Sequence, residues 1–205
     1  MSQTKAQLIS DLVQALAFTA TSSAPANGVY LSATNTLSFA TNSGERLSID
    51  SNGNATLNGI SLGRGLGNVA TNTVVGNNAL DANTTGANNT AIGDEALTAN
   101  TTGSQNTAVG TFSMDANTDG VNNAAVGYNS LGTNTSGQSN SAFGKEALFQ
   151  NTTGNFNTAI GTEALRLNTA GSQNTAVGRF ALDSNTTANS NTAVGASALS
   201  ANTTG

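Results

Sequence analysis

The sequence predicts a mainly β protein. A parallel β-roll, or β-solenoid, of eight 17-residue repeats is expected after a short N-terminal helix and a small β region. The first observation is a motif that returns without insertion: residues 89–93 read Asn-Thr-Ala-Ile-Gly, and residues 106–110 and 174–178 read Asn-Thr-Ala-Val-Gly. The glycine that closes each copy falls at positions 76, 93, 110, 127, 144, 161, 178 and 195. A fixed short period is typical of stacked structural repeats.

Composition is the second observation. Of the 205 residues, 8% are charged, 4% are aromatic and 37% are hydrophobic, and much of the hydrophobic share is alanine. Such a chain has little from which to build an ordinary globular core, while its strict period argues against disorder. The net charge of −5 and the lack of a basic cluster make nucleic acid an unexpected partner. No segment predicts membrane insertion or a signal peptide, and there is no cysteine for disulfide or thiolate chemistry.

Residues 1–26 are expected to be an attachment element. Within them, residues 2–17 predict a helix with one apolar stripe of residues spaced for a single face. An isolated helix of about 15 residues is marginal in water, so the stripe needs a partner surface. The segment ends in a joint that contains Pro25. The stripe consists of Leu8, Ile9, Leu12, Val13 and Leu16.

Residues 27–71 predict a neck of short strands. Alternating apolar residues favour strands at 29–31, 37–39 and 47–49. Turns are expected at Asn27-Gly28, at residues 42–44 and at Asn52-Gly53, where a positive φ is easily adopted. A glycine-rich joint at residues 63–67 precedes the repeats, which occupy residues 72–205.

Each repeat is expected to form one coil. A strand of about five residues, Asn-Thr-Ala-Val-Gly, should point its Thr and Val one way and its Asn and Ala the other. The Ala-Leu pair that follows should begin a second extended segment, and Asn-Thr-Thr-Gly should turn the chain back. About one Val or Ile, one Leu and two Ala per coil are then available for burial. Proline should be tolerated worse at Ala125, in a strand, than at Asn129.

Two resemblances follow from these segments. Residues 44–54, Gly-Glu-Arg-Leu-Ser-Ile-Asp-Ser-Asn-Gly-Asn, resemble a segment common in bacteriophage tail-fibre and related virion fibre proteins. The repeats of residues 72–205 are similar to the head repeats of trimeric autotransporter adhesins (YadA-like), whose motif is roughly Ser-Val-Ala-Ile-Gly. The second resemblance implies a left-handed parallel β-roll in which three chains form one trimer.

Association is also expected without any resemblance. The free energy gained by burying the few apolar side chains of one coil is smaller than the entropy cost of ordering its 17 residues. A second apolar contact, between chains, would close that gap. The small Asn/Ala/Gly face was the surface expected to allow it, in an obligate homotrimer.

The sequence therefore predicts a structural virion fibre, of tail or head, that acts as a rigid trimeric stalk or adhesin in host attachment. Its expected partners are other tail or capsid proteins, bound through the N-terminus, and a host surface glycan or receptor. It should be made in the host cytoplasm and reside in the virion. The alternatives are an ice-binding or other extracellular β-solenoid adhesin, and a tailspike polysaccharide depolymerase.

No enzyme is predicted, and no cofactor or metal site. The chain lacks histidine, which excludes the usual triads, and the carboxylates of the repeats are mostly single. The variable positions of the repeats carry the candidate receptor surface, because exposed aromatic and arginine side chains suit binding patches. The alternative is that these rings cover coil edges or fill the seam between chains. The candidates are Phe112, Tyr128, Phe149, Phe156, Phe180, Arg166 and Arg179.

Overall fold

A computed structural model of the chain describes residues 27–33, 36–42, 44–50, 53–65, 67 and 69–204. The predicted helix at residues 2–17 lies outside the described residues, as does its apolar stripe. The chain divides into two compact units, Met1–Gly59 and Ile60–Gly205.

The described part of the first unit is an antiparallel meander. It comprises β1 (Asn27–Ala33), β2 (Thr36–Thr41), β3 (Gly44–Ile49) and β4 (Ala55–Leu57), each paired with the next. These strands contain the three predicted at residues 29–31, 37–39 and 47–49. The expected turn at Asn27-Gly28 is wrong, because both residues pair with β2 as the start of β1.

Short polar residues shape the turns of this meander. Asn42 follows β2 with a φ of 51°, a value that asparagine tolerates better than most residues. Between β3 and β4, the carboxylate of Asp50 accepts hydrogen bonds from the backbone N–H of Asn54 at 2.9 Å and from its Nδ2 at 3.1 Å. Gly53 completes this turn with a φ of 81°.

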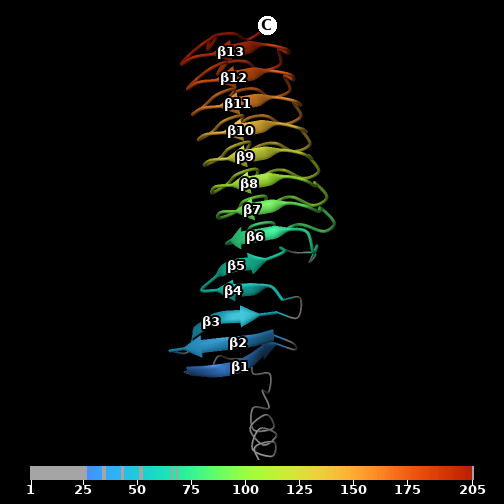
Figure 1. Cartoon of the computed structure of the whole chain (residues 1–205), viewed down its shortest axis with the longest axis vertical. Coiled ribbons are helices and arrows are strands. Elements are labelled where there is room, and N and C mark those ends of the chain that lie inside the picture. The colour runs from blue at the N-terminus through green and yellow to red at the C-terminus, as the bar shows by residue number, and fades with distance from the viewer. Residues whose placement is uncertain are drawn as a thin grey trace, which may run out of the picture. The chain divides into compact units, whose positions relative to one another are not determined.

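The second unit is a β-solenoid, which confirms the predicted fold class. β5 (Ile60–Gly63) pairs antiparallel with β6 (Thr73–Gly76), and from β6 to β13 every strand pairs parallel with the next, with residue i beside residue i+17. Figure 1 shows these strands stacked in chain order. The further strands are β7 (Thr90–Ile92), β8 (Thr107–Val109), β9 (Ala124–Val126), β10 (Ser141–Phe143), β11 (Thr158–Ile160), β12 (Thr175–Val177) and β13 (Thr192–Val194).

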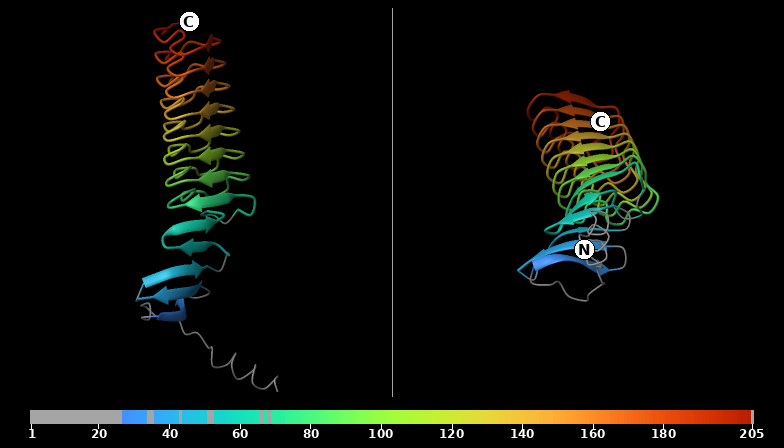
Figure 2. Two further views of the ribbon diagram at one scale, coloured as in Figure 1. Left: turned by 60° about the vertical axis from the view of Figure 1, so that its left-hand side comes forward. Right: turned by 60° about the horizontal axis from the view of Figure 1, so that its bottom comes forward.

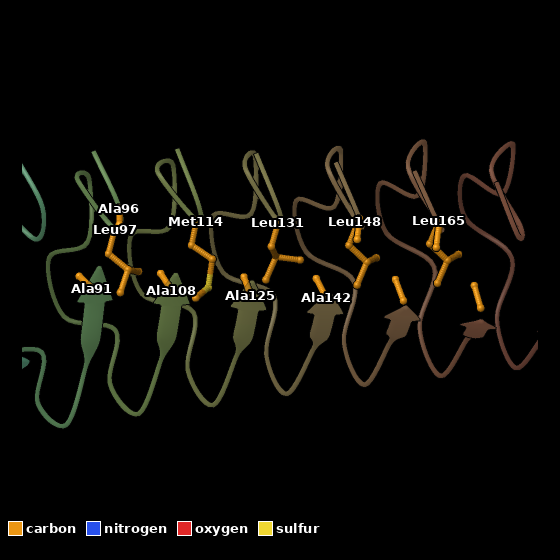
Figure 3. Close-up of a cluster of buried hydrophobic side chains, with 14 of the residues drawn as sticks. Ala91, Ala96, Leu97, Ala108, Met114, Ala125, Leu131, Ala142, Leu148 and Leu165 are labelled. Atoms are coloured by element: carbon orange, nitrogen blue, oxygen red, sulfur yellow. The ribbon is translucent and has the colours of Figure 1, made fainter. Parts of the chain in front are cut away.

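Positions within a coil are numbered here from the asparagine before each strand, so that Asn89 is position 1 and Gly93 is position 5. The strands occupy one side of the coils and the connecting turns the other (Figure 2). Alanine at position 3 points inward from the strand and meets leucine or methionine at position 9, which comes from the turns opposite (Figure 3). Positions 3, 8 and 9 are fully buried from the coil of Ala91 to that of Leu182 and form a thin core, apolar except for Ser113 and Ser130 at position 8.

Two ladders of buried asparagine complete the interior. At position 12, Asn100 donates from Nδ2 to Asn83 Oδ1 of the preceding coil at 3.1 Å and to the carbonyl oxygen of Gly103 at 3.0 Å. At position 1, Asn89 donates from its backbone N–H to Asn72 Oδ1 at 2.9 Å and from Nδ2 to the same Gly103 oxygen at 2.8 Å. Both patterns recur in the following coils, so most buried amides are paired. Within the described residues, Asn185 Oδ1 and Asn202 Nδ2 lack a partner, where the position-12 ladder ends.

The strand faces are oriented as predicted, but their roles differ from the expectation. Thr and Val or Ile point outward, while Asn and Ala point inward. The Asn/Ala/Gly face therefore forms the interior of each coil, and the expectation that it contacts another chain is wrong. The Val or Ile expected to be buried is instead partly exposed. The physical reason is that stacked asparagines satisfy one another, so the interior can accept them.

The segment after the strand also differs from the prediction. The Ala-Leu pair does not begin an extended segment, because every position-9 residue lies in the left-handed region, with φ between 50° and 55°. Positions 7 and 17 adopt positive φ as well. Asn129, at position 7, has a φ of 51° and donates its N–H to Thr111, so proline is excluded there as it is at Ala125. A comparison of proline at Ala125 with proline at Asn129 therefore does not distinguish the strand residue from the turn residue.

Glycine occupies position 15 in every coil except that of Ala188, and close approach rather than φ disfavours a side chain there. A Cβ on Gly137 would meet Asn134 Oδ1, Gly154 O at 2.6 Å and Asn151 Nδ2 at 2.8 Å. A Cβ on Gly132 would meet the Phe149 ring at 3.1 Å, which can move. We therefore expect Gly137→Ala to destabilise the solenoid by at least about 2 kcal/mol and Gly132→Ala by less than about 1 kcal/mol. Urea unfolding of the two variants tests this, and equal midpoints would contradict the ladder as described.

Candidate functional site

The charged side chains in the described repeats avoid one face of the solenoid. They lie at positions 6, 7, 10 and 14 of the coil, beyond the strand. They are Asp81, Asp94, Glu95, Asp115, Asp119, Lys145, Glu146, Glu163, Arg166, Arg179 and Asp183. The face formed by positions 2 and 4 of strands β6 to β13, here called the outer face, contains no charged residue.

The outer face carries a continuous apolar ladder. Position 4 is Val, Ile or Phe in every coil, and these residues stack in register along the parallel sheet. Most of them are substantially exposed, from 36% for Val126 through 44% for Ile160 to 71% for Val194. A contiguous exposed apolar stripe on an uncharged face is typical of an interaction surface. This face is the candidate functional site.

The outer face was missed by sequence reasoning as a binding surface. Its signal is the Thr-x-Val alternation, which does predict that Thr and Val share a face. That alternation does not reveal which face is buried. Hydrophobicity alone favours Val inside and the Asn/Ala/Gly side outside, which is the reverse of the observed burial.

Two pairs of the predicted receptor residues do contact each other. The rings of Phe112 and Tyr128, from successive coils, meet edge to face with centroids 6.1 Å apart and planes at 78°. The guanidinium carbon of Arg179 lies 4.3 Å from the centroid of the Phe180 ring. Tyr128 is 46% exposed. Both pairs lie at positions 6 and 7, where side chains extend from the turn after the strand.

The remaining predicted receptor residues lie elsewhere on the coil. Arg166, at position 10, is ion-paired with Glu163 at 3.2 Å and with Asp183 at 3.1 Å. Phe149, also at position 10, is half-buried beside Gly132, and Phe156, at position 17, is 63% exposed. The seven candidates therefore occupy four different positions of the coil: 6, 7, 10 and 17.

Two charged groups have perturbed pKa values. Burial raises the pKa of Asp115, and the nearby carboxylate of Glu95 adds to the rise, while hydrogen bonds from the backbone of Asp115 and Ala116 oppose it. The hydrogen bond to Asp183 raises the pKa of Arg166 further above its ordinary value, so this guanidinium stays charged. Neither group lies on the outer face.

Within the described ranges, no three His, Cys, Asp or Glu side chains gather where they could hold a metal ion. In the same part of the chain, no helix is both long and apolar enough to cross a membrane. The attachment stripe predicted at Leu8 to Leu16 cannot be placed, because it lies outside these ranges.

Comparisons with known proteins add no identification. No protein-family model matches the chain, and no curated protein or solved structure gives a match.

The perturbed Asp115 gives a testable pH dependence. Because its pKa is raised in the folded protein, ionisation of Asp115 disfavours the folded state, so stability falls as the pH rises from the ordinary aspartate pKa through the raised one. Asp115→Asn should raise the melting temperature at pH 7 by no more than about 2 °C, since water screens a half-exposed group.

The difference between Asp115→Asn and wild type should vanish near pH 3. Asp119→Asn, in the exposed turn of the same coil, is the control. A variant that is less stable than wild type at pH 7 would refute the destabilising role of the carboxylate.

Proposed function

We propose that this chain is a structural fibre protein of a virion, of tail or head, whose solenoid forms a rigid trimeric stalk for host attachment. The observation that carries the proposal is the outer face: a regular, apolar, uncharged stripe that runs along the solenoid. The fibre resemblance of residues 44–54 and the adhesin-like repeats of residues 72–205 support the same class.

Stiffness is the first property that suits a stalk. Each coil is joined to the next by a parallel strand ladder and by asparagine side chains at two positions. At one strand spacing of about 4.8 Å per coil, the repeats span roughly 40 Å. A rod built this way resists bending, because displacing one coil relative to the next breaks backbone and side-chain hydrogen bonds at the same time.

Assembly is the second property. The exposed Val, Ile and Phe of the outer face supply the apolar contact that a coil with a small alanine and leucine core needs. Burial of this face removes no charge from water, so its burial carries no charge-desolvation cost. A trimer buries the outer face against two neighbours and leaves the charged positions in solvent.

The adhesive surface belongs, on this proposal, to the variable positions. The Phe112–Tyr128 and Arg179–Phe180 pairs, with the exposed Phe156, offer aromatic surface to a host glycan or receptor. Rings of this kind stack against sugar or protein groups, and Arg adds hydrogen-bond donors.

An ice-binding solenoid is the second candidate, because one observation favours it. Threonine at position 2 forms an outward ladder beside the aliphatic ladder at position 4. However, both ladders are interrupted in the middle of the sheet. The threonine ladder is interrupted at Ala124 and Ser141, and the aliphatic ladder at Phe143. The turn threonines at position 13 are already engaged, as Thr101 Oγ1 donates to the carbonyl of Thr118 at 3.1 Å. Thermal hysteresis of the purified protein would favour this function over the fibre.

A tailspike depolymerase has less support. Retaining and inverting glycosidases use two carboxylates with different protonation states. Glu163 and Asp183 both contact Arg166, which neutralises them as an ion-pair group. Both carboxylates thus contact the same guanidinium, an arrangement typical of a structural ion-pair group.

The assembly has a direct test with a matched pair of variants. Ile160→Lys places a charge on the outer face, and Gln138→Lys places the same charge on an exposed residue at position 16. We expect wild type and Gln138→Lys to scatter light as a trimer, three times the 20.3 kDa of the chain, and Ile160→Lys to lose the trimer. A folded wild-type monomer would refute the trimeric stalk.

The N-terminal attachment proposed for Leu8, Ile9, Leu12, Val13 and Leu16 needs a separate experiment. Deletion of residues 1–20 should leave the repeats folded as trimers but remove them from purified particles. The copy number per particle is the measurement, and trimer formation by the deletion variant is the control. Incorporation at the wild-type copy number would place the attachment elsewhere in the chain.

A further inference from the structure

The residues of the outer face that depart from the repeat lie in two adjacent coils. Position 4 is Val or Ile in every coil except one, where it is Phe143. Position 2 is Thr in every coil except two adjacent ones, where it is Ala124 and Ser141. Ser141 pairs with Ala124 and Phe143 pairs with Val126 in the parallel sheet, so the large ring and the two small residues are neighbours.

The substitutions nearly balance in volume. Phenylalanine has roughly four heavy atoms more than valine, and serine with alanine have roughly three fewer than two threonines, a compensation expected of packed surfaces. Phe143 remains 40% exposed within its own chain. A face in contact with water alone places no limit on side-chain volume, so the compensation points to a surface that packs against something.

We propose that a second copy of this chain covers the outer face in register, and that Phe143 of each copy lies over Ser141 and Ala124 of its neighbour. The proposal rests on the trimer proposed above and specifies its interface. Around a threefold axis, contacts are heterologous, so position 4 of one chain meets position 2 of the next. Each trimer then contains three equivalent Phe143 contacts.

The outer face itself indicates a copy as the occupant. Its rows repeat at one strand spacing, which only a surface of the same period matches along its full length. It carries no charge to attract a charged partner. Its footprint is roughly 400 Å² from strand length and spacing, about half of what a standard partner contributes to a stable pair. A three-chain arrangement, in which each face meets two neighbours, makes better use of so narrow a surface.

The proposed contact would solve a problem that identical repeats create. Regular rows of Thr and Val would pack almost equally well after a slip of one coil, because register is weakly specified in uniform surfaces. One pair of adjacent coils with a large ring and two small residues makes one alignment of the chains more stable than the others. Phe143 thus fixes how the three chains align along the solenoid.

The alignment can be read by cross-linking, because the chain has no cysteine of its own. Thr158→Cys/Ile160→Cys keeps Phe143 and should give a covalent trimer on a non-reducing gel after oxidation. Within one strand, residues two apart are about 6.5 Å or more from each other, which disfavours a bond inside the chain. Thr158→Cys/Val126→Cys, with the two cysteines separated by two coils, should not cross-link if the copies are in register.

The volume compensation has its own test. Ala124→Thr/Ser141→Thr should clash with the ring and lower the melting temperature of the trimer by roughly 3–10 °C. Adding Phe143→Val creates a uniform face and should restore most of that loss. The triple variant also shows that any failure of the double variant is not a general folding defect.

The outcomes separate the two proposals. In-register cross-links together with rescue by the triple variant support the Phe143 contact. A trimer that cross-links out of register, or a triple variant no more stable than the double, overturns that contact and leaves the trimer. A chain that is monomeric in light scattering overturns both.

Discussion

The solenoid depends on a hydrogen-bond junction in which two asparagine side chains share one carbonyl oxygen. From the coil of Asn72 to that of Asn174, the amides at positions 1 and 12 donate to the position-15 carbonyl, as Asn106 and Asn117 do to Gly120. Their Oδ1 atoms accept from the next coil, except at Asn185. A buried amide without partners is costly, so adding or removing one residue in a coil would unpair several groups at once. This constraint explains a period of 17 that never varies, and the glycine that leaves the amides room at position 15 in every coil except that of Ala188.

The same junction explains what sequence reasoning could and could not predict. The period predicted a stack of coils, parallel pairing of residue i with i+17, and strands at the Asn-Thr-Ala-Val-Gly motif, because these need only the spacing. The direction of burial was not predictable from hydrophobicity. Asn89 is buried and Ile92 is 38% exposed, the reverse of the usual preference, because the amide is satisfied only when a neighbouring coil supplies its partners. A single repeat contains no sign of that neighbour.

Backbone conformation is the second feature that could not be predicted from the sequence. Leu97 and its equivalents hold φ near 54°, where leucine is uncommon and mildly strained. The turn directs this side chain onto the alanine of the strand opposite, and its full burial offsets the strain. The candidate receptor residues also lie in such turns: Phe112 and Phe156 occupy positions 7 and 17, both with a φ of 57°. The spacing between Phe112 and Phe156 in the sequence is not a multiple of 17, so these residues do not stack in one column.

Placing asparagine inside moves the larger aliphatic residues outward, and this exchange creates the apolar outer face. Alanine and one leucine or methionine fill most of the interior of a coil, while Val126 and Ile160 lie outside it. These side chains collect on the outer face instead, where they repeat with the same spacing as the strands. Charges are confined to the turns after the strand, as with Lys145 and Glu146 at 3.2 Å. The asparagine interior thus lets a thin coil satisfy its own polar groups, while the apolar surface that it cannot bury remains available to other chains.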